Sequence, residues 1–128
     1  ALDWISKPID ETRVLSALQR IAPAGSKKPV ILHVEDDEDI RQVVMALIGN
    51  EGVVIAAPSL AEAKRNMLSA HVDLIILDLG LPDGAGLDLL SFLNEKALDT
   101  PVIIFSATEL SADVAQQVKA ALVKSRTT

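Results

Sequence analysis

An α/β fold with a parallel β-sheet is the fold class that this sequence predicts. Short apolar runs alternate strictly with segments of helical periodicity, and the runs are apolar on both faces. Parallel strands that helices cover on both sides have this unbroken apolar character. The clearest run is Leu74 to Leu77, which leads into Asp78, and Pro82 and Gly84 then force a turn.

The first 29 residues predict a strand, a helix and a linker. Residues 2–6 form the strand, which Lys7 and Pro8 end. The helix begins near Asp10, its expected N-cap, and reaches residue 22; its apolar positions at helical spacing are Val14, Leu15, Leu18 and Ile21. Residues 23–29 are a linker by composition.

The main body begins at residue 30. Its strands are expected at 30–34, 53–57, 73–77 and 101–105, with a last, very short one at 122–123. The helices between them are expected at about 40–48, from the Ser59 cap onward with Ala63, Met67 and Leu68 on its apolar face, at 87–96 and at 111–120. Ser59 and Glu62 have the spacing of a capping box. This alternation predicts right-handed crossovers and helices on both faces of the sheet.

Composition narrows the class of protein. A chain of 128 residues with 49% hydrophobic residues is long enough for one well-packed domain. The formal net charge of −6 argues against a nucleic-acid groove, which needs clustered Lys and Arg. The absence of cysteine excludes disulfides and thiolate metal sites. No apolar run approaches the roughly 20 residues of a membrane helix, so no membrane contact is expected.

Polar side chains gather at the predicted carboxyl ends of the strands. Glu35 and Asp36 follow the strand at 30–34, and Asp78, Ser106 and Lys124 follow three later strands. These ends share one edge of a parallel sheet, where ligands bind in open α/β folds. Clustered carboxylates with open water positions suit Mg²⁺. Asp78 is placed to act as a nucleophile that forms an aspartyl phosphate, while Ser106 and Lys124 would contact the phosphoryl oxygens.

Each of these residues also has an ordinary structural interpretation. Glu35 and Asp36 could be first-turn acids that favour the helix dipole, and Asp78 could cap a turn. Ser106 alone would be a turn residue and Lys124 a surface charge. The joint placement of all five is what favours a site. His33 lies inside a predicted buried strand and is expected to be a satisfied core histidine.

The same residues resemble a response-regulator receiver domain. Ile31 to Asp37 resembles the family's first strand with its acidic pair, and Leu74 to Gly84 resembles the phosphoacceptor strand with its Leu-Pro-Asp-Gly loop. Phe105-Ser106-Ala107 resembles the Ser/Thr-Ala motif, and Lys124 resembles the family's lysine. The resemblance covers residues 30–125 and implies a flavodoxin-like (βα)₅ sheet in the order 2-1-3-4-5.

The resemblance also implies a function. Asp78 would take a phosphoryl group from a histidine kinase or a histidine phosphotransfer domain in the cytoplasm. Mg²⁺ would be bound by Asp36, Asp78 and the main-chain carbonyl of Gly80, with Glu35 acting through water. The chain departs from the family pattern at Ala121, where an aromatic residue is usual, and at Ser125, where the family has Pro.

Residues 1–22 resemble the last strand and helix of a preceding receiver. The expected organisation is therefore this piece, a linker at 23–29, and a receiver at 30–128 that lacks its fifth helix, as a tandem-receiver hybrid histidine kinase would contain. Helix 10–22 could fill the groove of the missing helix in cis, or in trans as a homodimer formed by exchange. Strand 2–6 could also compete for the sheet edge with residues 121–124, in which case Lys7 would replace Lys124.

Two other functions are open at this point. A degenerate receiver would serve only for docking, which the missing aromatic residue permits but the full acid set opposes. A phosphohydrolase of the haloacid dehalogenase type would need an Asp two positions after the nucleophile, and Gly80 stands there. A nucleotide site is not indicated, because no glycine-rich phosphate loop follows a strand.

Overall fold

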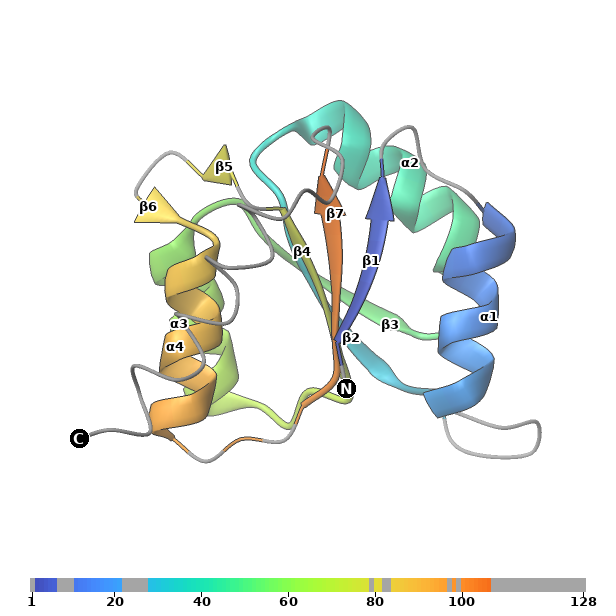
Figure 1. Ribbon diagram of the computed structural model, residues 1–128. Helices are drawn as coiled ribbons and strands as arrows, with labels where there is room; N and C mark the ends of the chain where they lie inside the picture. Colours follow the sequence, from blue (N-terminus) through green and yellow to red (C-terminus); the bar gives the residue numbers. More distant parts are fainter. Residues whose placement is uncertain are drawn as a thin grey trace.

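A computed structural model gives the backbone of most of the chain. It describes residues 2–6, 11–21, 28–78, 80, 81, 84–96, 98 and 100–106. The described strands form a five-stranded parallel sheet and a separate two-stranded antiparallel ribbon, and four described helices flank the sheet (Figure 1). The helix predicted at 111–120 and the strand predicted at 122–123 lie outside the described residues.

The strands of the main sheet follow one another in the order β1-β7-β4-β2-β3. Their bounds are Leu2–Ser6 for β1, Val30–Val34 for β2, Val53–Ala57 for β3, Leu74–Asp78 for β4 and Val102–Ser106 for β7. Counted from β2, as in the resemblance, the described strands of the main body lie in the order 2-1-3-4, as predicted. The fifth place, beside β7, is occupied by β1.

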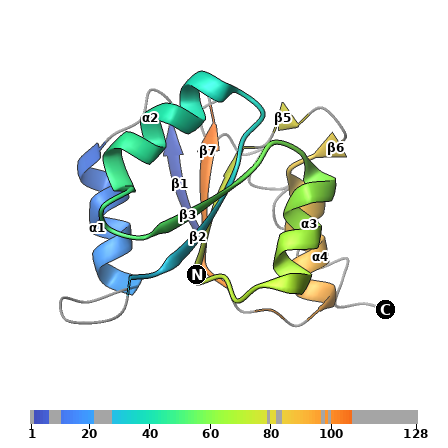
Figure 2. The ribbon, with the colours of Figure 1, turned by 180° about the vertical axis from the view of Figure 1, so that it is seen from behind.

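The helices lie in two layers. Helices α1 (Glu11–Ile21) and α2 (Glu38–Ile48) cover one face, and α3 (Leu60–Ser69) and α4 (Leu87–Glu95) cover the other (Figures 1 and 2). Helix α1, expected in cis or in trans, therefore packs on the sheet of its own chain. The longest described helices have 11 residues, and none is long and apolar enough to cross a bilayer.

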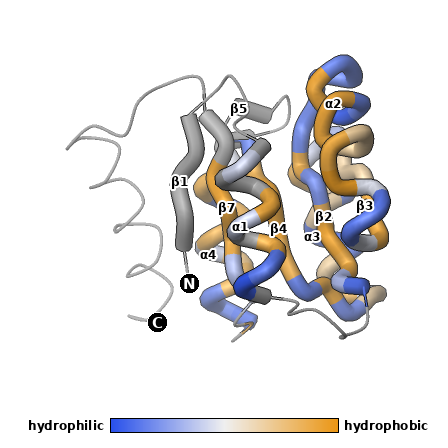
Figure 3. The backbone as a smooth tube through the Cα atoms, turned by 90° about the vertical axis from the view of Figure 1, so that its right-hand side faces the viewer, coloured by the Kyte–Doolittle hydropathy of each residue, from blue (hydrophilic) through white to orange (hydrophobic). Residues whose placement is uncertain are grey.

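The sheet separates two apolar cores. Successive side chains of each strand point to opposite faces of the sheet. In Figure 3 the colour for hydrophobic residues runs along strands β2, β4 and β7. On the α1/α2 side the buried residues are Leu18, Ile31, Val44, Ile48, Leu74, Ile76 and Ile103. The α3/α4 side is larger and includes Leu32, Val34, Met67, Ile75, Leu77, Leu89, Leu93 and Ile104. The apolar runs of the central strands β2 and β4 are thus buried on both faces, whereas the edge strand β3 is partly exposed.

Local hydrogen bonds explain where the elements begin. The Ser59 hydroxyl accepts from the Glu62 N–H at 3.3 Å, so the predicted N-cap is confirmed. At the amino ends of the strands, Asp73 Oδ2 accepts a hydrogen bond from the Val30 N–H at 2.8 Å. The other carboxylate oxygen of Asp73, Oδ1, lies 2.9 Å from His71 Nε2. Asp73 therefore ties the start of β2 to the start of β4.

Several predicted details are wrong. Strands β4 and β7 each begin and end one residue later than predicted, at 74–78 and 102–106. Helix α2 begins at Glu38 because Asp37 caps it, two residues before the first apolar position. Leu68 was placed on the apolar face of α3 but is 66% exposed, since Ala63 and Met67 already fill that face.

Candidate functional site

Asp78 is the last residue of the most deeply buried strand. The four residues before it are fully buried, whereas Asp78 itself is half-buried. Buried apolar neighbours on both faces hold the backbone of β4 in place. The carboxylate is thereby presented at the carboxyl edge of the sheet, next to strands β2 and β7.

Five consecutive acids, residues 35–39, follow β2, and the first three differ in their environments. Glu35 is 1% exposed, whereas Asp36 is exposed. Asp37 caps α2, because its Oδ1 accepts from the Asp39 N–H at 2.9 Å and from the Ile40 N–H at 3.3 Å. The cap aligns helix α2 with the end of the strand, so the chain turns directly after the first two acids.

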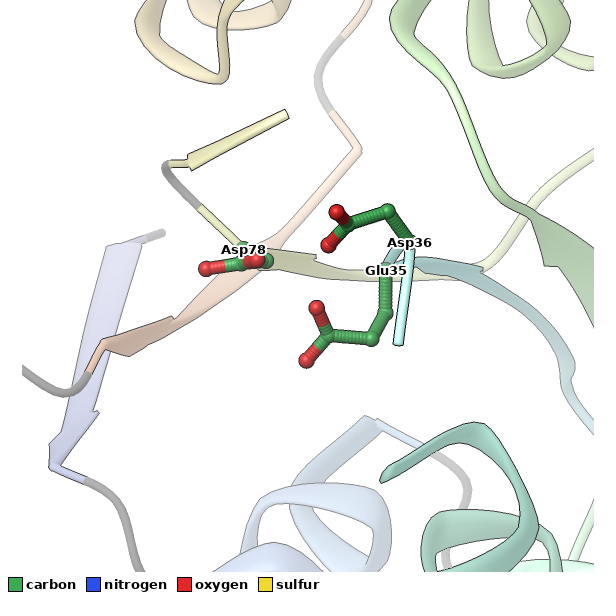
Figure 4. A group of neighbouring side chains, drawn as sticks. All are labelled: Glu35, Asp36 and Asp78. Atoms are coloured by element: carbon green, nitrogen blue, oxygen red, sulfur yellow. The ribbon is translucent and has the colours of Figure 1, made fainter. Parts of the chain in front are cut away.

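Glu35, Asp36 and Asp78 form one cluster. One carboxylate oxygen from each lies within 4.8 Å of the other two. Figure 4 shows the Glu35 and Asp36 side chains extending from the end of β2 toward Asp78 at the end of β4. The strand register explains the meeting: Val34 is paired with Leu77, so the next residues, Glu35 and Asp78, are level.

The backbone around Glu35 is fixed from two sides. Its N–H donates to the Ala57 carbonyl of β3 at 3.0 Å. Its carbonyl accepts from Arg41 Nη1 of helix α2 at 2.8 Å. A carboxylate that is almost fully buried beside two others is costly unless positive charge balances it. The fixed backbone holds three carboxylates close together although they repel one another. This arrangement is the one expected of a cation-binding site.

The donor set fits a hard divalent cation. Three carboxylates from two strand ends offer only oxygen ligands, and the exposed Asp36 leaves one side open to water. Mg²⁺ prefers one or two carboxylates and keeps several waters, so it suits this arrangement better than a softer metal. The structure therefore brings the three predicted carboxylates together in one acidic cluster.

The structure locates only some of the other predicted site residues. Ser106 ends β7, and its neighbour Phe105 is paired with Asp78, so the end of β7 lies at the same edge of the sheet. Gly80 lies in β5 (Gly80–Leu81), which pairs with β6 (Gly84–Ala85) just beyond Asp78. Lys124 and Lys7 lie outside the described residues.

Sequence reasoning missed two features near the site. The β5–β6 ribbon was expected only as a turn, although two glycines and a proline in five residues are a hairpin signal. The Arg41 contact with the Glu35 carbonyl joins positions six apart, across the start of a helix. No periodicity marks such a contact, so only coordinates could reveal it.

In open parallel α/β sheets, ligands bind at the carboxyl ends of the strands, and the acidic cluster of this chain lies at that place. Residues 31–124 match the family described as the response regulator receiver domain. The chain belongs to this family, whose members are signalling modules.

Curated relatives support the assignment. The chain is 29% identical over 118 residues to the alkaline phosphatase synthesis transcriptional regulatory protein SphR of Synechococcus elongatus; the match covers 84% of this chain and 45% of SphR. It is 39% identical over 80 residues to the transcriptional regulatory protein PmrA of Pectobacterium parmentieri, covering 62% of this chain and 36% of PmrA. The chain thus spans less than half the length of these relatives.

Solved structures show the same fold. The chemotaxis protein CheY4 of Vibrio cholerae superposes with a TM-score of 0.67 at 28% identity, over 74% of this chain and 81% of CheY4. The non-phosphorylated HemR receiver domain of Leptospira biflexa gives 0.64 at 32% identity, over 72% and 75%. The MaeR response regulator bound to beryllium trifluoride gives 0.57 at 30% identity, over 69% and 75%. The flavodoxin-like receiver fold predicted from the sequence is confirmed.

Proposed function

We propose that this chain is a phosphoacceptor receiver in which Asp78 takes a phosphoryl group from a phosphohistidine. The observation that carries the proposal is the convergence of Glu35, Asp36 and Asp78 within 4.8 Å at the carboxyl edge of the sheet. The description of one similar receiver as non-phosphorylated, and of another regulator as bound to beryllium trifluoride, agrees with a phosphoryl site in relatives.

Asp78 is the nucleophile because it combines a fixed backbone with partial exposure. One of its carboxylate oxygens attacks phosphorus in line with the leaving group. The new P–O bond forms as the P–N bond to the donor imidazole breaks, and the imidazole leaves as the neutral base after it gains a proton. Phosphoryl transfer requires little covalent chemistry from the protein, so positioning of the reactants and neutralisation of charge account for most of the rate acceleration.

Glu35, Asp36 and Asp78 would hold Mg²⁺, and the Gly80 carbonyl is proposed as a fourth protein ligand. When bound, the ion would neutralise charge on the transferring phosphoryl oxygens. Ser106 would donate a hydrogen bond to one of those oxygens. A lysine ammonium would pair with another, and the two candidates are Lys124, by the order of the chain, and Lys7, which follows β1.

The partner is a histidine kinase or a histidine phosphotransfer domain, and we place the exchange in the cytoplasm, where ATP-derived phosphohistidine is available. We also propose that residues 1–22 derive from the end of a second receiver, since Ser6-Lys7-Pro8 and the helix after it resemble the close of that fold. A hybrid histidine kinase with tandem receivers would contain such a chain.

Acetyl phosphate tests the proposal without the natural donor. In the presence of Mg²⁺, the intact mass should rise by one phosphoryl group, and EDTA should prevent the rise. Asp78→Asn should abolish it, while the matched variant Asp88→Asn, which removes an exposed acid of helix α4, should not. An unmodified mass in the wild type would instead favour a receiver that only docks.

A further inference from the structure

A pocket lies at the amino ends of the strands, on the side of the sheet that α3 and α4 cover. Its lining comes from the end of α3, from the segment that leads into β4 and from the segment that leads into β7. Its volume is about 400 Å³, which is in the range of small-molecule sites. The acidic cluster lies at the carboxyl ends of the same strands, so the two places are separate.

The walls of the pocket are mainly apolar. Met67 and Val72 line it, are 7% and 5% exposed, and belong to the larger core. Leu98 lines it as well and packs against that core. Pro101 lies opposite, and its carbonyl accepts from the Ile75 N–H of β4 at 3.0 Å, which joins two of the walls. The pocket is therefore formed without a ligand and offers an apolar surface.

One carboxylate, that of Asp73, belongs to this lining. Its Oδ2 accepts from the Val30 N–H at 2.8 Å, and its Oδ1 lies 2.9 Å from His71 Nε2. A carboxylate has about four acceptor positions, so Asp73 keeps acceptor capacity for a ligand. The Asp73 side chain is 33% exposed, and a ligand in the pocket can therefore reach it.

The helix ends add negative potential at the same place. Helices α3 and α4 end just before β4 and β7 begin, and Figure 1 shows them side by side with these ends at the amino edge of the sheet. A helix carries a partial negative charge at its C-terminus. Of the described residues that line the pocket, His71 is basic and none is lysine or arginine. Lys96, just beyond α4, is exposed and is not part of the lining.

We infer that this pocket binds a small organic cation, in which a flat apolar body carries an amidinium or guanidinium group. The apolar body would lie against Met67, Val72 and Leu98. The N–H groups would donate to the Asp73 carboxylate, because a planar cation can give a carboxylate two parallel, charge-assisted hydrogen bonds. The helix ends would favour the same charge. This site is additional to the phosphoacceptor site and does not depend on it.

Three probes with the same ring test the sign of the charge: benzamidine is a cation, benzamide is neutral and benzoate is an anion. Each is titrated into the ¹⁵N-labelled whole chain with Mg²⁺ in excess, so that the acidic cluster is occupied. Benzamidine should shift the amide signals of His71, Val72, Asp73 and Leu98, with a dissociation constant on the order of 1 mM for so small a ligand. Benzamide should bind about tenfold more weakly, and benzoate should not bind.

Two pairs of variants locate the interaction. Asp73→Asn removes the charge but keeps an oxygen that can accept from the Val30 N–H. It should weaken benzamidine about tenfold and leave benzamide unchanged, while the matched variant Asp88→Asn, at an exposed acid of α4, should alter neither.

The second pair fills the pocket. Ala70 lines it, so Ala70→Trp should abolish binding of both probes, whereas Ala61→Trp, at an exposed position in the first turn of the same helix, should not. If Asp73→Asn loses its fold by circular dichroism, the tryptophan pair and the three probes still decide the matter.

Several results would overturn the inference. These are the absence of shifts up to about 10 mM benzamidine, ten times the expected dissociation constant, equal affinities for the three probes, and shifts confined to Glu35, Asp36 and Asp78. Asp78→Asn, which removes the proposed phosphoacceptor, should bind benzamidine as the wild type does. A chain that no donor phosphorylates but that binds benzamidine beside Asp73 would contradict the proposed function alone.

Discussion

Replacing Leu18 by Ala tests whether helix α1 is part of the folded core. Leu18 is 4% exposed and joins the sheet cluster with Ile76 and Ile103. Leu→Ala substitutions at such sites cost about 2–5 kcal/mol, because apolar burial is lost and a cavity remains. A value near 3 kcal/mol is expected here, since the site lies under a surface helix that can partly relax.

The loss can be measured as a shift in Tm. For a domain of this size, about 4 °C per kcal/mol corresponds to a fall of roughly 12 °C. Thermal unfolding followed by far-UV circular dichroism would detect it at once. The matched control is Gln19→Ala on the same helix, which changes an exposed residue and should alter stability by no more than about 0.5 kcal/mol.

The reasoning would be refuted if Leu18→Ala and Gln19→Ala unfolded at the same temperature. Helix α1 would then be detached from the sheet in solution, contrary to the packing of Leu18 in the core. A fall that depends on protein concentration would indicate instead that the helix docks in trans between two chains.

Four further results are expected. Mg²⁺ at a hundred times its Kd should raise the free energy of unfolding by about 2.7 kcal/mol, and Asp36→Asn should remove most of that gain in a thermal shift assay. Asp37→Ala should cost about 1 kcal/mol in urea unfolding, because it uncaps α2. Asp73→Ala should cost about 1–3 kcal/mol, because it leaves the Val30 N–H without its acceptor. Sedimentation equilibrium should find a monomer, as cis docking of α1 requires; a dimer would support exchange.

The fold was predictable because its main signals are local. Unbroken apolar runs such as Leu74 to Leu77 are buried to the last residue, and the alternation with helices predicted a parallel sheet; the order of its strands followed from the resemblance to receiver domains. The acidic pocket followed as well, since the ends of parallel strands share an edge and Val34 is level with Leu77.

The place of β1 was not decidable from the sequence. Residues 2–6 and 121–124 carry similar strand signals, and which of them pairs with β7 depends on the free energy of docking a whole strand and helix. The burial of Leu18 stabilises the docked segment of β1 and α1, and the hydrophobic periodicity of the sequence does not show this contribution. The exposure of Leu68 was also not predictable, because helical spacing shows which side of a helix is apolar but not how wide the buried stripe is.

The most direct test of the central claim is to locate the phosphoryl group. After acetyl phosphate and Mg²⁺, borohydride reduces an aspartyl phosphate to homoserine, and tandem mass spectrometry then reads the position. We predict homoserine at residue 78 and not at Asp36, and we predict that Glu35 is not reduced to its own alcohol, which is one methylene longer than homoserine. Homoserine at another aspartate, or its absence from a protein that binds Mg²⁺, would contradict the account.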